Sequence, residues 1–298
     1  MNDVGPRSQP SVDAIVSDTA SEVPAMRFLQ LVVAFLLLLS LTACSQWSAA
    51  YYTAQGDAHL RKGDYDKAIQ DYNQAISRDP KSARALAGRG AAYLDKGDYD
   101  RAIQDFNQTL RLAPKAALTF NGRGAAYLAK GDYDRALQDL NEAIRLNPKI
   151  QRAFLNRGMA NVYAGHLSEA QQDLSQYFQM DPKDPYGAMW LYLARAKAGT
   201  DGKSELKTNT AALDLSKWPG PVIQLYLDQS TPENVLRAAG NDGDQRCEYS
   251  FYVGEYRALR GERPEALALF RTASDGCPKD FIEYVPAVIE LNYLDKQK

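Results

Sequence analysis

LRKGDYDKAIQDYNQAISRDP (residues 60–80) is followed, at intervals of 34 residues, by LDKGDYDRAIQDFNQTLRLAP (94–114) and LAKGDYDRALQDLNEAIRLNP (128–148). In each copy the glycine is suited to end a helix in the left-handed conformation, and the aspartate after it is suited to cap the next helix. The closing proline ends that second helix. Each unit therefore predicts a hairpin of two helices, and the phase places units at 49–82, 83–116, 117–150, 151–184 and 247–280.

The 34-residue pattern resembles the tetratricopeptide repeat. Gly56, Gly90 and Gly124 stand where the first helix of a hairpin approaches the second, and bulky residues such as Tyr72 and Phe106 fill the space between neighbouring hairpins. Such units stack because one alone cannot bury its apolar face. We therefore expect an all-α tetratricopeptide-repeat superhelix with an irregular helical middle, a C-terminal repeat-like hairpin and a capping helix.

Residues 185–246 depart from the repeat and are expected to form an irregular helical segment. Its predicted parts are a helix over 186–198, a weaker one over 201–215, short helices over 221–227 and 231–239, and a loop over 241–245. Residues 281–298 are expected to form a capping helix and tail that cover the end of the stack. Pro286 should kink this helix or delay its start.

The apolar run FLQLVVAFLLLLSLTA (28–43) ends directly before Cys44. Its 16 residues are few for a spanning helix, which needs about 20, and suit the core of a signal peptide. The sequence Leu41-Thr42-Ala43-Cys44 resembles a bacterial lipobox, in which the cysteine becomes the lipidated first residue. We expect a signal peptide over 26–43 and lipidation at Cys44, which anchors the protein in a membrane. An uncleaved anchor is the alternative.

The first 25 residues are acidic and make a poor leader, whereas Met26-Arg27 would start a compact signal peptide. The chain starts at Met1 or Met26, and 1–25 is an acidic extension that is either disordered or not translated. Ser45 is not the acidic residue associated with retention in the inner membrane. This favours the periplasmic face of the bacterial outer membrane, with inner-membrane anchoring as the alternative.

Composition argues against nucleic-acid binding and catalysis. The 298 residues carry a net charge of −2, without the basic excess of nucleic-acid-binding proteins. The two histidines occupy a repeat packing position (His59) and a turn (His166). The Gly-Arg-Gly sequences at 88–90 and 122–124 lack the third glycine and preceding strand of a dinucleotide-binding motif. We predict no catalytic residues, metal or cofactor, and therefore no enzyme activity.

A partner would bind in the groove that the first helices line. Its expected lining is Asp57, Arg61, Arg84, Asp95, Asn121, Arg152, Leu155, Met159 and Tyr163. The clamp that chaperone-binding repeats use for a terminal carboxylate is absent, because its positions hold Thr53, Asp57, Gly88, Leu118 and Gly122. The apolar part of the lining, together with Val162, is either a ligand surface or, as we favour, covered by the irregular segment. An uncovered patch would indicate a partner.

Cys247 and Cys277 hold positions 1 and 31 of the last repeat unit. Antiparallel helices bring the start of one near the end of the other. In an exported protein such a pair predicts a disulfide, and two free buried thiols are the alternative.

Three stretches are more specific than generic repeat sequence. They are AFLNRGMANVYAGHLSEAQQDLSQYFQMDPKDPYGAMWLYLA (153–194), FYVGEYRALRGERPEALALFRTA (251–273) and FIEYVPAVIEL (281–291). With them the chain resembles the NlpI-type tetratricopeptide lipoproteins from about Ala49 to Leu294.

This resemblance implies a dimeric periplasmic scaffold anchored in the outer membrane. Such scaffolds act as adaptors that hold a carboxyl-terminal processing protease and a peptidoglycan hydrolase, so that the protease degrades the hydrolase. We expect a non-catalytic adaptor lipoprotein of this kind, with proteins as its partners. A structural or assembly component of an envelope complex, similar to a pilotin, is the alternative.

Overall fold

The computed structural model describes residues 48–279, 281 and 283–296, and this part of the chain contains helices and no strand. The expected all-α fold is therefore confirmed. The expected signal peptide, Cys44 and the acidic extension lie outside the described residues. A helix over 48–61 is followed by α2 (Tyr65–Arg78), α3 (Ala83–Asp95), α4 (Tyr99–Leu112), α5 (Ala117–Ala129), α6 (Tyr133–Leu146), α7 (Gln151–Ala164), α8 (Leu167–Met180), α9 (Pro185–Lys197), α10 (Lys203–Asn209), α11 (Gly220–Tyr226), α12 (Pro232–Ala239), α13 (Gly243–Leu259), α14 (Arg263–Gly276) and α15 (Tyr284–Lys296).

The hairpin turns follow the chemistry of their residues. Gly97 and Gly131 adopt φ values of +74° and +76°, which side chains disfavour, and each ends the first helix of its hairpin. Asp98 and Asp132 then accept hydrogen bonds from the backbone N–H groups three residues later. Asp64 makes no such bond, so the expected cap of α2 is wrong.

Large rings fill the space between the helices. The Tyr72 ring lies between Gly56 of its own hairpin and Gly88 of the next, where added Cβ atoms would come within 2.7 and 2.4 Å of it. Phe106 has the same position between Gly90 and Gly122. Glycine is thus required on two successive first helices so that one ring can fix both the hairpin and the stack.

Each of three repeats also holds an arginine between two helices. Arg123 Nε and Nη2 donate to the two Asp139 oxygens at 2.7 Å, and Nη1 donates to Asn107 of the preceding hairpin at 2.5 Å. Arg89, one repeat earlier, makes the equivalent contacts with Asp105 and Asn73. Arg157, one repeat later, makes them with Asp173 and Asn141. The Gly-Arg-Gly sequences are therefore explained by contacts between repeats.

The irregular middle contains the expected helices, but its end differs from the prediction. The loop predicted over 241–245 is wrong, because α13 already begins at Gly243. Asp242 caps it by accepting from the Gln245 backbone N–H at 3.0 Å. The boundary predicted at residue 247 therefore lies inside α13, and the last hairpin starts before the repeat phase indicates.

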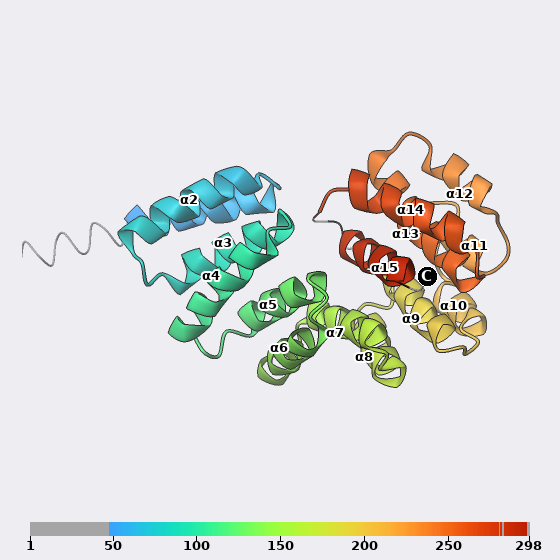
Figure 1. Ribbon diagram of the computed structural model, residues 1–298, viewed down its shortest axis with the longest axis horizontal. Helices are drawn as coiled ribbons and strands as arrows, with labels where there is room; N and C mark the ends of the chain where they lie inside the picture. Colours follow the sequence, from blue (N-terminus) through green and yellow to red (C-terminus); the bar gives the residue numbers. More distant parts are fainter. Residues whose placement is uncertain (1–47, 280, 282, 297–298) are drawn as a thin grey trace, which may run out of the picture.

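The last helix turns inwards. First helices of neighbouring hairpins contact one another, α3 with α5 and α5 with α7, so they occupy the crowded inner side of the curve that α2 to α8 follow (Figure 1). From its position on α14, α15 turns back and contacts α5. Pro286 lies in the first turn of α15, which begins at Tyr284 instead of residue 281, as a delayed start predicts. The helix thus reaches the inner side of the superhelix as well as packing on the last hairpin.

Candidate functional site

The polar part of the expected groove lies on the inner side of the first four repeats. Arg61, Arg84 and Arg152 are exposed. Arg84 Nη2 lies 2.6 Å from Asp57 Oδ2, and the other oxygen of that carboxylate accepts from the Tyr72 hydroxyl at 2.7 Å. This contact joins the first hairpin to the second and leaves the outer edge of the Arg84 guanidinium facing solvent.

The remaining polar positions are partly covered. Asp95 is half-buried at the end of α3. Asn121 accepts a hydrogen bond from Asn156 of the next first helix at 3.1 Å. Between these residues, Leu118 of α5 is 71% exposed. An exposed leucine with arginines on the neighbouring repeats makes this the open part of the inner face.

The apolar part of the expected groove is not open. Leu155 and Met159 of α7 are buried in the same core cluster as Trp190 of α9 and Ile289 of α15. Leu155 and Met159 therefore do not line an open groove, which agrees with the favoured expectation that they are covered, and the covering residues come from α15 as well as from the irregular segment. The apolar strip of α7 has become core because the C-terminal helices pack around it, which removes it from any partner.

A cavity of about 820 Å³ lies where the ends of three first helices (α5, α7 and α13) and of α9 meet α15. This volume is in the range of small-ligand and side-chain binding sites. Tyr163, from the expected groove, lies in its wall. The lining is Ala129, Lys130, Gly131, Tyr133, Val162, Tyr163, Gly165, Leu167, Ala196, Lys197, Ala258, Leu259, Ile289, Glu290, Asn292, Tyr293 and Leu294.

Two buried acids and a half-buried lysine meet beside this cavity. Lys197 Nζ lies 2.6 Å from Glu290 Oε1 and 2.9 Å from Glu255 Oε2. Glu255 is completely buried and Glu290 is 3% exposed. Burial and the neighbouring Glu290 carboxylate raise the pKa of Glu255. Burial alone would lower the pKa of Lys197, but the two carboxylates raise it overall. The lysine is therefore firmly charged and faces two acids.

Sequence reasoning missed this cluster, because its members come from α9, α13 and α15. A local signal was present. Glu255 interrupts the apolar run FYVGEY, and Glu290 interrupts AVIEL. Single acids in apolar runs are costly unless they are paired, so they indicate a buried ion pair or a site.

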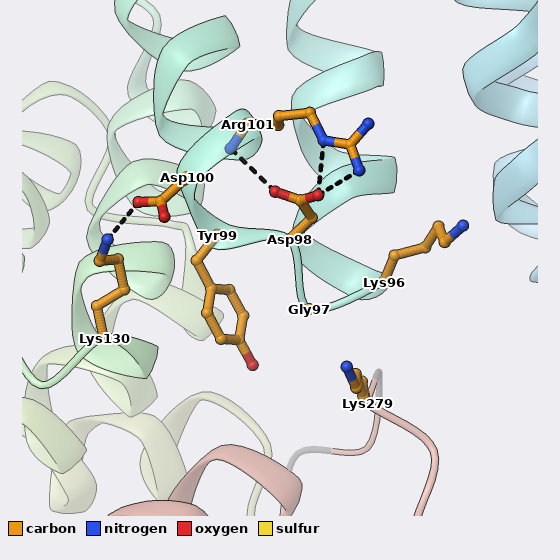
Figure 2. A pocket seen from close by; sticks show the side chains of 8 residues that line it. All are labelled: Lys96, Gly97, Asp98, Tyr99, Asp100, Arg101, Lys130 and Lys279. Carbon is orange, nitrogen blue, oxygen red and sulfur yellow. Dashed lines mark hydrogen bonds and ion pairs between the residues drawn. The ribbon is translucent and has the colours of Figure 1, made fainter.

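A shallower hollow of about 410 Å³ lies beside the turn between α3 and α4, shown in Figure 2. Lys279 reaches this turn from the segment after α14, and a Cβ on Gly97 would lie 2.6 Å from its Cδ. Other charges in the lining are paired, as Lys130 is with Asp100. The hollow marks the place where the C-terminal part touches the second repeat.

The histidines have structural surroundings. His59 Nδ1 lies 2.7 Å from Asp71 Oδ2, at the place where later repeats use the arginine pair. His166 precedes α8 and makes no side-chain cap. Within residues 48–279, 281 and 283–296 there is no group of three or more histidine, cysteine, aspartate or glutamate residues that could hold a metal ion. The same residues form no helix long and apolar enough to span a membrane.

Cys247 in the first turns of α13 and Cys277 directly after α14 come together. Their Cα atoms are 5.5 Å apart, and the structure joins their sulfur atoms in a disulfide. The bridge closes a loop with a sequence separation of 30. In the chain-entropy account such a loop stabilises the fold by about 3–4 kcal/mol.

We predict that denatured, unreduced protein from the cell envelope does not react with a thiol reagent at Cys247 and Cys277. After reduction both should react, and the unfolding midpoint of the reduced protein should be lower. Quantitative labelling of both cysteines without reduction would contradict the prediction.

Comparisons with known proteins agree with this architecture. Residues 53–117 and 117–150 match models of the tetratricopeptide repeat. Among solved structures, PilF of Pseudomonas aeruginosa is 16% identical, covers 85% of this chain and 99% of its own, and superposes with a TM-score of 0.52. A tetratricopeptide repeat protein of Parabacteroides merdae is 18% identical over 82% of this chain and 84% of its own, with a TM-score of 0.51.

MamA of Desulfovibrio magneticus covers 56% of this chain and 97% of its own, at 20% identity and a TM-score of 0.51. At these identities the likenesses concern the fold. Proteins with tetratricopeptide repeats are generally non-catalytic scaffolds for protein–protein interaction. The chain thus carries tetratricopeptide repeats in an all-helical superhelix, and these repeats imply a protein–protein interaction scaffold.

Proposed function

We propose that the protein is a lipid-anchored adaptor of the bacterial periplasm, which holds a carboxyl-terminal processing protease next to cell-wall hydrolases. The apolar run 28–43 and Cys44 support export and anchoring. The resemblance to NlpI-type lipoproteins supports the choice of partners and a homodimer. The outer membrane is the proposed site, since Ser45 is not acidic.

The observation that carries the proposal is the open inner face of the first repeats. Leu118 is 71% exposed there, and Arg84 and Arg152 on the neighbouring first helices are exposed as well. The apolar residues further along the curve are core. An exposed apolar residue with arginines around it suits a partner protein, because arginine and large apolar side chains contribute most to interfaces.

The test is degradation of a peptidoglycan hydrolase by a purified processing protease. Added protein, lacking the residues before Trp47, should speed degradation because two bound partners have a raised effective concentration. Leu118→Asp on the inner face should remove most of this effect. Leu112→Asp is the matched control, since Leu112 is 40% exposed at the end of the second helix α4. The protein alone should not cleave peptidoglycan.

Hydrolase half-lives in a deletion strain can contradict the adaptor function. If every wall hydrolase keeps its normal half-life without this protein, the adaptor function is excluded. A defect confined to the assembly of an envelope complex would then favour the structural, pilotin-like function.

The anchor has its own test. Cys44→Ala should abolish acylation and cleavage, because the lipobox cysteine is the acyl acceptor, and should leave an unprocessed precursor. Intact mass of the wild-type protein should show a mature chain that begins at Cys44. A different N-terminus would contradict the proposed anchor.

A further inference from the structure

The charges at the cavity floor do not balance. Lys130 in the lining is paired with Asp100 on the preceding hairpin. Lys197 is the other cation, and it faces the two carboxylates of Glu255 and Glu290. With both carboxylates ionised, the cluster would have one negative charge in excess, and the raised pKa of Glu255 indicates that a proton on this acid cancels the excess when no ligand is bound. Buried charges are stable only when they are paired, so this point favours one further positive charge or a proton.

Aromatic and apolar surface lies above these charges. The Tyr133 and Tyr163 rings are stacked with centroids 6.1 Å apart and an interplanar angle of 26°. At the rim, Leu259 and Tyr293 are 36% and 58% exposed. They are two of the six large apolar side chains exposed in the described part of the chain. Such an arrangement is suited to a ligand with an apolar body, and aromatic faces attract cations.

The acids determine which ligands fit. An anion would meet Lys197, but Glu255 and Glu290 already surround that ammonium group and would repel a further negative charge. An apolar ligand would fit the walls but would make no use of the second carboxylate, which would keep its proton. A cation on an aliphatic stem fits both the walls and the acids, because the stem covers the tyrosines and the positively charged head can take the place of the proton held by the two carboxylates.

We propose that this cavity binds a lysine or arginine side chain presented by an apolar segment of a partner protein. The cation lies beside Glu290, the stem lies along Tyr133 and Tyr163, and the flanking apolar residues contact Leu259 and Tyr293. This site specifies how the proposed scaffold binds a partner. The proposal rests on the scaffold function and does not require the protease or the hydrolase to be the partner. It lies at the edge formed by α15 and the hairpin turns, away from Leu118 on the open inner face.

The probe is a fluorescently labelled peptide amide, Gly-Leu-Phe-Lys-Phe-Leu-Gly, compared with the same peptide carrying norleucine in place of lysine. Binding to the full chain in detergent is measured by fluorescence anisotropy. A charge-assisted contact of about 1.5–3 kcal/mol predicts at least about 10-fold tighter binding of the lysine peptide. Equal affinity for the two peptides, or no binding of either, would overturn the proposal.

Two pairs of variants locate the site. Glu290→Gln should reduce the preference for lysine to less than about 3-fold and leave norleucine binding unchanged, which also reports that the cavity is still folded. Glu233→Gln, an exposed acid on α12, should keep the full preference. Tyr293→Ala should weaken the binding of both peptides, whereas Leu118→Ala should leave the binding of both unchanged. If Leu118→Ala weakened peptide binding and Tyr293→Ala did not, the peptide would bind on the open inner face, and the proposal would be overturned.

No protease or hydrolase takes part in this measurement. Failure of the peptide to bind leaves the adaptor function standing. Unchanged hydrolase half-lives in a deletion strain would exclude the adaptor function but would not contradict the proposed cation-binding cavity.

Discussion

Replacing Arg123 by alanine is expected to lower the free energy of unfolding by about 3–5 kcal/mol, the usual cost of removing one partner from a buried ion pair. Its guanidinium binds both oxygens of Asp139, whose side chain is 6% exposed, at 2.7 Å. Without it the carboxylate is left buried between the two helices of the third hairpin. The same substitution also removes the contact with Asn107, so it loosens the stacking of the second repeat on the third. Urea unfolding of both proteins measures the difference.

Two further variants separate this account from a general effect of losing an arginine. Arg101 pairs with Asp98 in the same hairpin at the surface, with 59% of its side chain exposed, so Arg101→Ala should leave the midpoint almost unchanged. Arg123→Met combined with Asp139→Leu should recover most of the lost stability, because no unpaired charge remains. If Arg123→Ala cost no more than Arg101→Ala, the buried pair would not stabilise the third hairpin.

The hairpins could be predicted from the sequence because their signals are local. Gly97 and Asp98 determine the turn and the start of α4 by their own backbone and side-chain chemistry. Asp64 shows the limit of this reasoning. It has the same place in the repeat, but its carboxylate pairs with Lys67 at 3.3 Å instead of capping the backbone.

The binding surface could be predicted only in part. Arg84 and Arg152 are exposed as their repeat positions indicate, whereas Leu155 and Met159, which share the repeat positions of the half-buried Asn121 and Asp57, are core. The difference arises from the C-terminal helices, which fold back from far along the chain. The repeat pattern of α7 does not indicate that the C-terminal helices fold back onto this part of the chain.

The start of α13 was missed for a different reason. The repeat phase predicted the hairpin from residue 247, and the sequence NDGDQ has the composition of a loop. Its first aspartate, however, precedes Gln245 by the spacing of a helix cap. Asp242 therefore starts the helix early, because a satisfied backbone N–H group outweighs the modest cost of one glycine in the first turn.

Stability is expected to fall as the pH rises from about 5 to about 8, because the C-terminal part buries acids that prefer to be protonated. Glu283 is 6% exposed and accepts a hydrogen bond from the Tyr252 hydroxyl at 2.8 Å. Burial, together with the nearby Glu248 carboxylate, raises the pKa of Glu283 to about 7. Burial also raises the pKa values of Glu248 and Glu255.

The sign follows from proton binding. A folded-state pKa of about 7, against 4.5 for the ordinary carboxyl group, means that the native state binds more protons than the unfolded state between these values. The free energy of unfolding therefore decreases with pH through this window, and the stabilising contribution is lost above the folded pKa. For Glu283 alone the loss amounts to about 3 kcal/mol, and the other two acids act in the same direction.

Urea unfolding at pH 5.5 and pH 8 tests this expectation, and one substitution assigns it to a residue. Glu283→Gln keeps an acceptor for the Tyr252 hydroxyl and cannot ionise, so it should be more stable than the wild type at pH 8 and show a smaller change between the two pH values. Glu233→Gln removes an exposed acid whose pKa is lowered, chiefly by a backbone hydrogen bond, and which titrates below this window. It should retain the full pH dependence. If stability instead rose between pH 5.5 and 8, the buried acids would have to be ionised in the native state, with their charges balanced by groups other than those that surround them here.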